Sequence, residues 1–137
     1  MKTTLTVKKI ADAQPALVRL ASEKFKGANA GKIIYNISRN IGFTEPIVIA
    51  YQKAYNALVK NFRVKRKART EQEEDAWIIP DESQQAFQDA IEAEQNREEE
   101  IEVRQVVLPA TTDDNPSHIN GIDRYLLDWM VKVEGEE

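Results

Sequence analysis

The feature that most constrains this fold is a long apolar stripe in the first half of the chain. It runs through Ile34, Ile37, Ile41, Val48, Tyr51, Tyr55, Leu58 and Phe62. Successive members stand three, four or seven residues apart, which keeps them on one face of an α-helix. Thr44 is the polar exception in the repeat. The stripe predicts one helix from about Asn29 to about Arg66, which must pack in a hairpin or against another chain because it would span roughly 57 Å.

Two residues inside this stripe leave two interpretations open. Pro46 has no amide to give the Gly42 carbonyl, so a continuous helix is expected to kink there. Alternatively, the chain breaks at Gly42 and Phe43, and Thr44 caps a second helix with Pro46 in its first turn.

The other elements are expected to be short. The predicted helices are a turn over 8–14, a helix over 15–26, another over 82–97 and a last one over 121–133. The predicted strands cover residues 2–7, 77–79 and part of 101–108, with the last two paired. The fold class is therefore mainly α, with shorter helices packed back on the long helix and a small two-stranded β element.

Charge divides the chain into two unlike halves within one expected domain, residues 1–137. Residues 1–70, the basic helical half, carry 15 Lys and Arg against three acidic residues, a balance of +12. Residues 71–137, the acidic helix-strand-helix half, carry four basic residues against 20 acidic ones, a balance of −16. The net charge of −4 hides this asymmetry, which points to charged partners or to mutual neutralisation.

The sign changes abruptly at Thr70, after the basic run Arg63, Lys65, Arg66, Lys67 and Arg69. The basic run could hold nucleic-acid phosphates, or the acidic half could mimic nucleic acid before a basic protein. The third and favoured interpretation is that the halves neutralise each other, since intramolecular neighbours are the nearest partners. We then expect Thr70 to lie in a turn of an exposed loop, with acidic residues of 71–100 near the basic run.

Aromatic residues of the stripe also have two interpretations. Tyr51, Tyr55 and Phe62 lie on the face of the isoleucines, which is typical of core packing. Tyr, Trp and Arg also concentrate binding energy at interfaces, and Trp129 in the last helix poses the same choice. Because the 82–97 helix carries few strongly apolar residues, part of the stripe is expected to pack on another subunit. A homo-oligomer, or a complex with another protein, follows as the expected assembly.

Catalytic patterns are weak in this sequence. There is no cysteine, and His118 is the single histidine, in a polar loop near Asp113, Asp114 and Ser117. Asp113-Asp114-Asn115 lacks the spacing of a calcium loop, and no Walker, GxSxG or HExxH motif occurs. Residues 1–10 do not resemble a signal peptide, and no long apolar run follows. We expect no enzyme activity, cofactor, metal or membrane partner.

Several phrases of the sequence carry a resemblance in their order: ALVRL, AWIIPDESQQAFQDAIEAEQNREEEIEV, VVLP and YLLDWMV. With the long helix between the first two, they resemble small uncharacterised proteins of tailed bacteriophages and prophages. The resemblance implies a location in the bacterial host cytoplasm or the virion, and it brings no known activity.

The expected function is therefore a non-enzymatic phage accessory protein acting through protein–protein interaction, such as a self-associating virion or assembly component. One alternative is an anti-CRISPR-like inhibitor of a bacterial defence complex that uses the acidic half as a nucleic-acid mimic. Another is a nucleic-acid binder that uses the basic run of residues 60–69.

Overall fold

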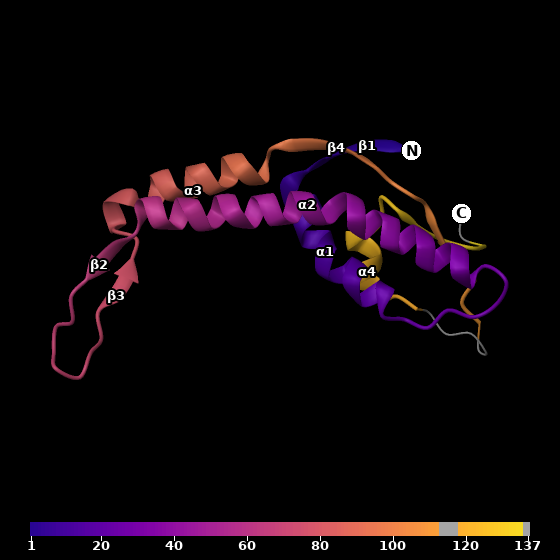
Figure 1. The fold of residues 1–137 in the computed structure, drawn as a ribbon, viewed down its shortest axis with the longest axis horizontal. Coiled ribbons are helices and arrows are strands. Elements are labelled where there is room, and N and C mark those ends of the chain that lie inside the picture. The colour runs from indigo at the N-terminus through magenta and orange to yellow at the C-terminus, as the bar shows by residue number, and fades with distance from the viewer. Residues whose placement is uncertain (113–117, 136–137) are drawn as a thin grey trace.

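A computed structural model describes the whole chain except residues 113–117 and 136–137. It shows a packed head, from which a pair of helices projects as an arm with a β-hairpin at its far end (Figure 1). We define the arm as residues 45–95 and the head as the other described residues. The mainly α class is confirmed.

Helices dominate both parts of the molecule. The four helices of the described residues are α1 (Val7–Ala21), α2 (Ala30–Phe62), α3 (Asp81–Gln95) and α4 (Gly121–Leu126). The strands are β1 (Lys2–Thr6), β2 (Val64–Arg66), β3 (Ala76–Ile78), β4 (Glu98–Glu102), β5 (Val106–Leu108) and β6 (Val131–Val133).

The strands of the described residues form three separate two-stranded sheets, where one β element was expected. β1 pairs antiparallel with β4, β2 antiparallel with β3, and β5 parallel with β6. The expected pairing of residues 77–79 with part of 101–108 is therefore wrong. β3 pairs instead with the strand just before it, because closing the short loop between them costs little chain entropy. β4 is left to pair with the distant β1.

The buried residues of the hydrophobic core all lie in the head and come from both charge halves, and Ile47 and Val48 at the base of the arm pack half-buried against them. α1 supplies Ile10, Leu17 and Leu20, which are almost completely buried. Residues from α2, β4, β5, β6 and the turn after α4 close around them: Ile33, Ile37, Ile101, Val106, Leu108, Leu127, Met130, Val131 and Val133. The basic and acidic halves are thus one packed unit in the head.

Two predicted helices have different bounds in the structure. α1 is a single helix that passes through Pro15, where a turn and a separate helix were expected. The Thr6 side chain caps it by accepting a hydrogen bond from the Lys9 amide, and Pro15 lies on its exposed face. The last helix stops at Leu126, because residues 131–133 pair with β5 and bury two valines there.

α2 is continuous through Pro46, which confirms the interpretation as one helix. It ends at Phe62 and not near Arg66, because β2 begins at Val64. Its buried face in the head also differs slightly from the predicted stripe. Ile33 is buried, whereas Ile34 is 51% exposed.

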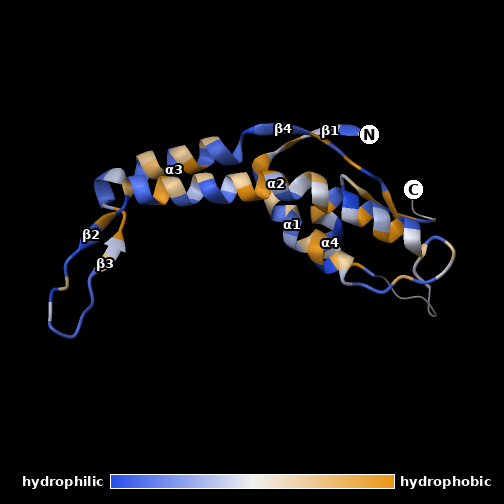
Figure 2. Ribbon diagram, in the orientation of Figure 1, coloured by the Kyte–Doolittle hydropathy of each residue, from blue (hydrophilic) through white to orange (hydrophobic). Residues whose placement is uncertain are grey.

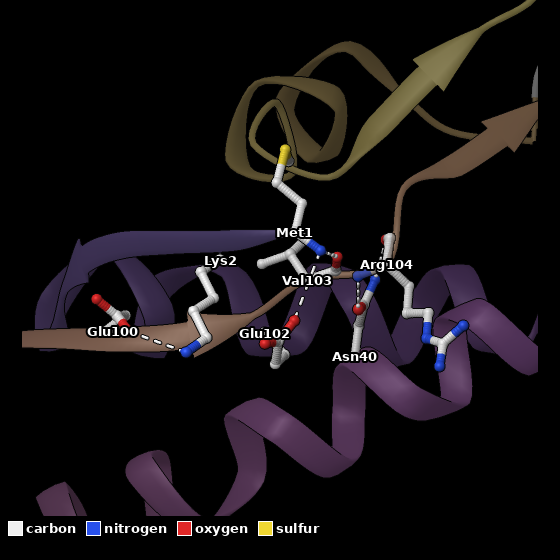
Figure 3. Close-up of polar contacts among 7 residues, drawn as sticks. All are labelled: Met1, Lys2, Asn40, Glu100, Glu102, Val103 and Arg104. Carbon is white, nitrogen blue, oxygen red and sulfur yellow. Dashed lines mark hydrogen bonds and ion pairs between the residues drawn. The ribbon is translucent and has the colours of Figure 1, made fainter.

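Besides its isoleucines, the buried face of α2 carries three polar side chains, and each of them has hydrogen-bond partners. Asn40 donates from Nδ2 to the Arg104 carbonyl at 2.7 Å and accepts the Arg104 amide at 2.8 Å (Figure 3). Asn36 donates to the Gln105 carbonyl at 3.2 Å, and the Thr44 hydroxyl donates to Gln14 Oε1 at 2.6 Å. These bonds attach α2 to α1 and to the segment between β4 and β5.

Ion pairs and hydrogen bonds connect the elements at the surface of the head. On the β1–β4 sheet, Lys2 Nζ lies 3.7 Å from Glu100 Oε1, and the amide of Val103 donates to the Met1 carbonyl at 2.8 Å (Figure 3). Between α1 and α4, Arg19 donates two hydrogen bonds to the buried Asp123 carboxylate, which lowers the pKa of that carboxyl. This contact stabilises the folded state above the ordinary pKa, and the stabilisation is lost as pH falls through the lowered pKa.

The continuity of α2 makes Pro46 a testable weak point. Pro46→Ala restores an amide for the Gly42 carbonyl at an exposed position, so we expect the free energy of unfolding to rise by about 1–3 kcal/mol. The control is Pro80→Ala: Pro80 is the N-cap of α3 with extended backbone, so its loss should be neutral or mildly destabilising. Chemical denaturation of the three proteins makes the comparison, and a less stable Pro46→Ala protein would contradict it.

Candidate protein-interaction site

The arm differs from the head in how little it buries. Buried residues of α2 end at Thr44, and α3 has none along its whole length. The strands of the terminal hairpin, β2 and β3, contain no buried residue either. Within the described residues, the arm is therefore a helix pair without a closed core.

A thin aromatic seam holds α2 and α3 together. Phe87 of α3 meets two rings of α2 edge-on, with centroids 6.3 Å from Tyr55 and 5.7 Å from Phe62. At the other end of the seam, Gln95 donates to the Tyr51 hydroxyl at 3.2 Å. Phe62, Phe87 and Tyr51 are only half-buried, and Tyr55 is 41% exposed. The seam thus leaves aromatic surface in water, which is typical of a face that binds another protein.

The hairpin at the end of the arm presents an aromatic ring together with cations. Lys65 lies directly opposite Trp77 in the β2–β3 register. The Arg63 guanidinium stacks over the Trp77 ring, 4.1 Å from its centroid, and Trp77 is still 58% exposed. A planar arginine on a tryptophan is a common anchor in protein interfaces.

The charge reversal at Thr70 lies in the loop of this hairpin, so the predicted exposed turn is confirmed. Asp75 forms an ion pair with Lys65 at 3.6 Å and accepts the Ala68 amide at 2.7 Å. Glu73 accepts the Arg69 amide at 3.1 Å. Most of the loop is hydrophilic (Figure 2). Acidic residues therefore do lie beside the basic run, as expected.

Some charge of the basic run remains unpaired. Within the described part of the chain, the side chains of Arg66, Lys67 and Arg69 form no ion pair, and all three are exposed. The loop carries Glu71, Glu73, Glu74 and Asp75 within a few residues of them. The tip is consequently a mixed-charge surface.

All but one of the residues proposed from the sequence lie on the arm. The arm carries Tyr51, Tyr55, Phe62, Arg63, Lys65, Arg66, Lys67 and Arg69. Trp129 instead lies in the head, half-buried against the core, and its Nε1 donates to the Leu126 carbonyl at 3.0 Å. Sequence reasoning missed Trp77 and Phe87 as members of the site. The proximity of Trp77 to the basic run depends on hairpin register, which composition does not reveal.

Of the residues weighed for catalysis, the structure describes His118. His118 lies against the Phe25 ring, with centroids 4.9 Å apart, beside a hollow of about 290 Å³ that Arg19 and Asp123 also line. Asp113, Asp114, Asn115 and Ser117 lie outside the described residues. Across the positions that the structure describes, no group of three or more His, Asp or Glu residues could hold a metal ion.

No known family model, curated protein or solved structure matches this chain. None of the helices in the described part combines the length and the apolar run needed to cross a bilayer.

The mixed charge of the hairpin predicts weak binding of nucleic acid. If Arg66, Lys67 and Arg69 alone contact phosphates, the log–log salt slope on duplex DNA should be no steeper than about −2.7. Asp75→Asn combined with Glu73→Gln should tighten binding and steepen the slope, since both acids now face the basic run. A salt series of DNA binding measures both slopes.

A slope near −4.5 for the wild-type protein would correspond to roughly five phosphate contacts. If charge reversal at Lys65, Arg66 and Lys67 abolished such a slope, the mixed-charge interpretation would be overturned. The basic run would then be a nucleic-acid site.

Proposed function

We propose that this protein is non-enzymatic and acts through protein–protein interaction, associating with itself through the arm. The observation that carries the proposal is the absence of any buried residue in the described arm, next to a head that contains all the buried residues of the core. An isolated helix pair of this kind is marginally stable in water, because most helical stability comes from packing an amphipathic face. A second arm would supply the missing packing.

The proposed setting is a tailed bacteriophage or its bacterial host, in the cytoplasm or the virion. The support is the order of sequence phrases that resembles phage and prophage proteins. Within that setting, a self-associating chain with a projecting arm suits a virion or assembly component. The tip, with Arg63 stacked on exposed Trp77, offers a second contact point for another protein of the assembly.

Self-association through the arm can be tested with one matched pair of variants. Tyr55→Asp places a carboxylate on the exposed seam, so it should weaken association at least about tenfold, which corresponds to roughly 1.4 kcal/mol. Tyr125→Asp makes the same change in the head, at a side chain that is 76% exposed, and should leave association unchanged. Sedimentation at a series of concentrations measures both dissociation constants.

A wild-type protein that stays monomeric at high micromolar concentration and moderate salt would refute the proposal. Equal weakening by both tyrosine substitutions would also count against it, because the contact would then not be specific to the arm.

A further inference from the structure

The two helices of the arm carry opposite charge on their outer edges. On α2, Tyr51, Leu58 and Phe62 face α3, and helical spacing places Lys53 and Lys60 on the opposite side. Both lysines are exposed, and neither forms an ion pair with any described residue. The outer edge of α2 is therefore basic, and its charge is not used within the chain.

The outer edge of α3 is acidic. This helix contains five acidic residues and no Lys or Arg. Phe87 and Ile91 face α2, so the same spacing places Asp89 and Glu92 on the far edge. Both are exposed, and in the described structure neither forms an ion pair. Asp89 accepts one hydrogen bond, from Gln85 of its own helix at 2.8 Å.

Between these edges, one broad side of the arm is uncharged over its middle. Tyr55 and Val59 of α2 lie on this side, with Gln88 and Ile91 of α3 next to them. Tyr55 provides the largest exposed apolar surface there. We call this surface the tyrosine side. An uncharged strip flanked by two charged edges is the pattern of helices that pair in bundles.

We propose that two copies of the chain pair through their tyrosine sides with the arms parallel, so that α2 of each copy packs on α3 of the other. This inference rests on the proposed self-association and specifies its geometry. It places both heads at one end of a four-helix bundle and both hairpin tips at the other.

Symmetry and charge favour parallel arms. Two identical sides can face each other about a two-fold axis that lies either along the arms or across them. An axis across the arms stacks α2 on α2 and α3 on α3, which brings like charges together. An axis along the arms stacks each basic edge on an acidic edge, and every neighbouring helix pair is then antiparallel.

The positions of the charged residues along the length of the arm also fit the parallel arrangement. Within one chain, Tyr51 bonds to Gln95, and Phe87 lies between Tyr55 and Phe62, so Lys53 lies near the level of Glu92 and Lys60 lies within about one helical turn of Asp89. Rotation about a two-fold axis along the arms leaves the position of every residue along the arm unchanged, so the same residues lie side by side between the two copies. Lys53 of one copy then lies beside Glu92 of the other, and the long side chain of Lys60 can reach Asp89 of the other.

Charge exchange tests this geometry. One variant, acidic-α2, carries Lys53→Glu and Lys60→Glu; the other, basic-α3, carries Asp89→Lys and Glu92→Lys. Each alone should associate roughly tenfold more weakly than wild type at low salt, because like charges then face each other. An equimolar mixture should recover wild-type affinity, because both of its interfaces again pair opposite charges. Sedimentation of each variant and of the mixture measures this.

A third variant, Lys24→Glu with Lys26→Glu, makes the same change in net charge as acidic-α2 but in the head. It should associate like wild type. Recovery in the mixture also shows that both exchanged chains are folded, so failure to fold cannot imitate the expected result.

The contrary outcomes are distinct. If each exchanged variant associates like wild type and the mixture associates more tightly, the arms are antiparallel; the inference fails while self-association stands. If neither the variants nor the mixture differ from wild type, the edges are not in the interface, and the inference fails. A wild-type protein that is itself monomeric refutes the proposed function as well.

Discussion

The Asn40 side chain holds both backbone groups of Arg104, and the rest of the structure depends on this contact. Asn40 is 1% exposed, so its amide must be satisfied within the protein, and the Arg104 amide and carbonyl satisfy it. An asparagine that bonds both groups of one peptide segment fixes position as well as distance. This contact fixes the position along α2 at which the segment between β4 and β5 crosses the helix. It thereby also fixes where β4 pairs with β1 and where β5 pairs with β6.

The head ends on α2 about one helical turn beyond this contact, at Thr44. Past Thr44, Ile47 and Val48 still pack half-buried against the core, and farther along the described part of α2 its main cover is α3, whose facing residues are few and half-buried. α2 has 33 residues, roughly 50 Å of helix, and only its first half is covered by the core. The protein therefore combines a self-sufficient head with an arm whose apolar surface exceeds what its own chain can bury. The arm also carries basic residues on the outer edge of α2 and acidic residues on the outer edge of α3.

Local patterns were readable from the sequence, and distant pairings were not. The periodicity of the stripe predicted α2 and placed Tyr51, Tyr55 and Phe62 together, because spacing on one helix is fixed by helical geometry. The pairing of β1 with β4 joins segments about a hundred residues apart, and nothing local specifies it. Trp77 was missed because its contact with Arg63 depends on strand register. The sequence also leaves the role of Trp129 open, because the packing of the whole fold decides whether its side chain is buried.

We infer that the head folds without a partner, whereas the packing of the arm is completed by a second copy. Hydrogen exchange at two protein concentrations tests it most directly. We predict that amides of α1 and of the first half of α2 exchange slowly and equally at both concentrations. Amides of α3 and of α2 beyond Thr44 should exchange quickly in dilute solution and become protected as concentration rises. Exchange in the arm that is as slow as in the head and independent of concentration down to nanomolar protein would contradict the account.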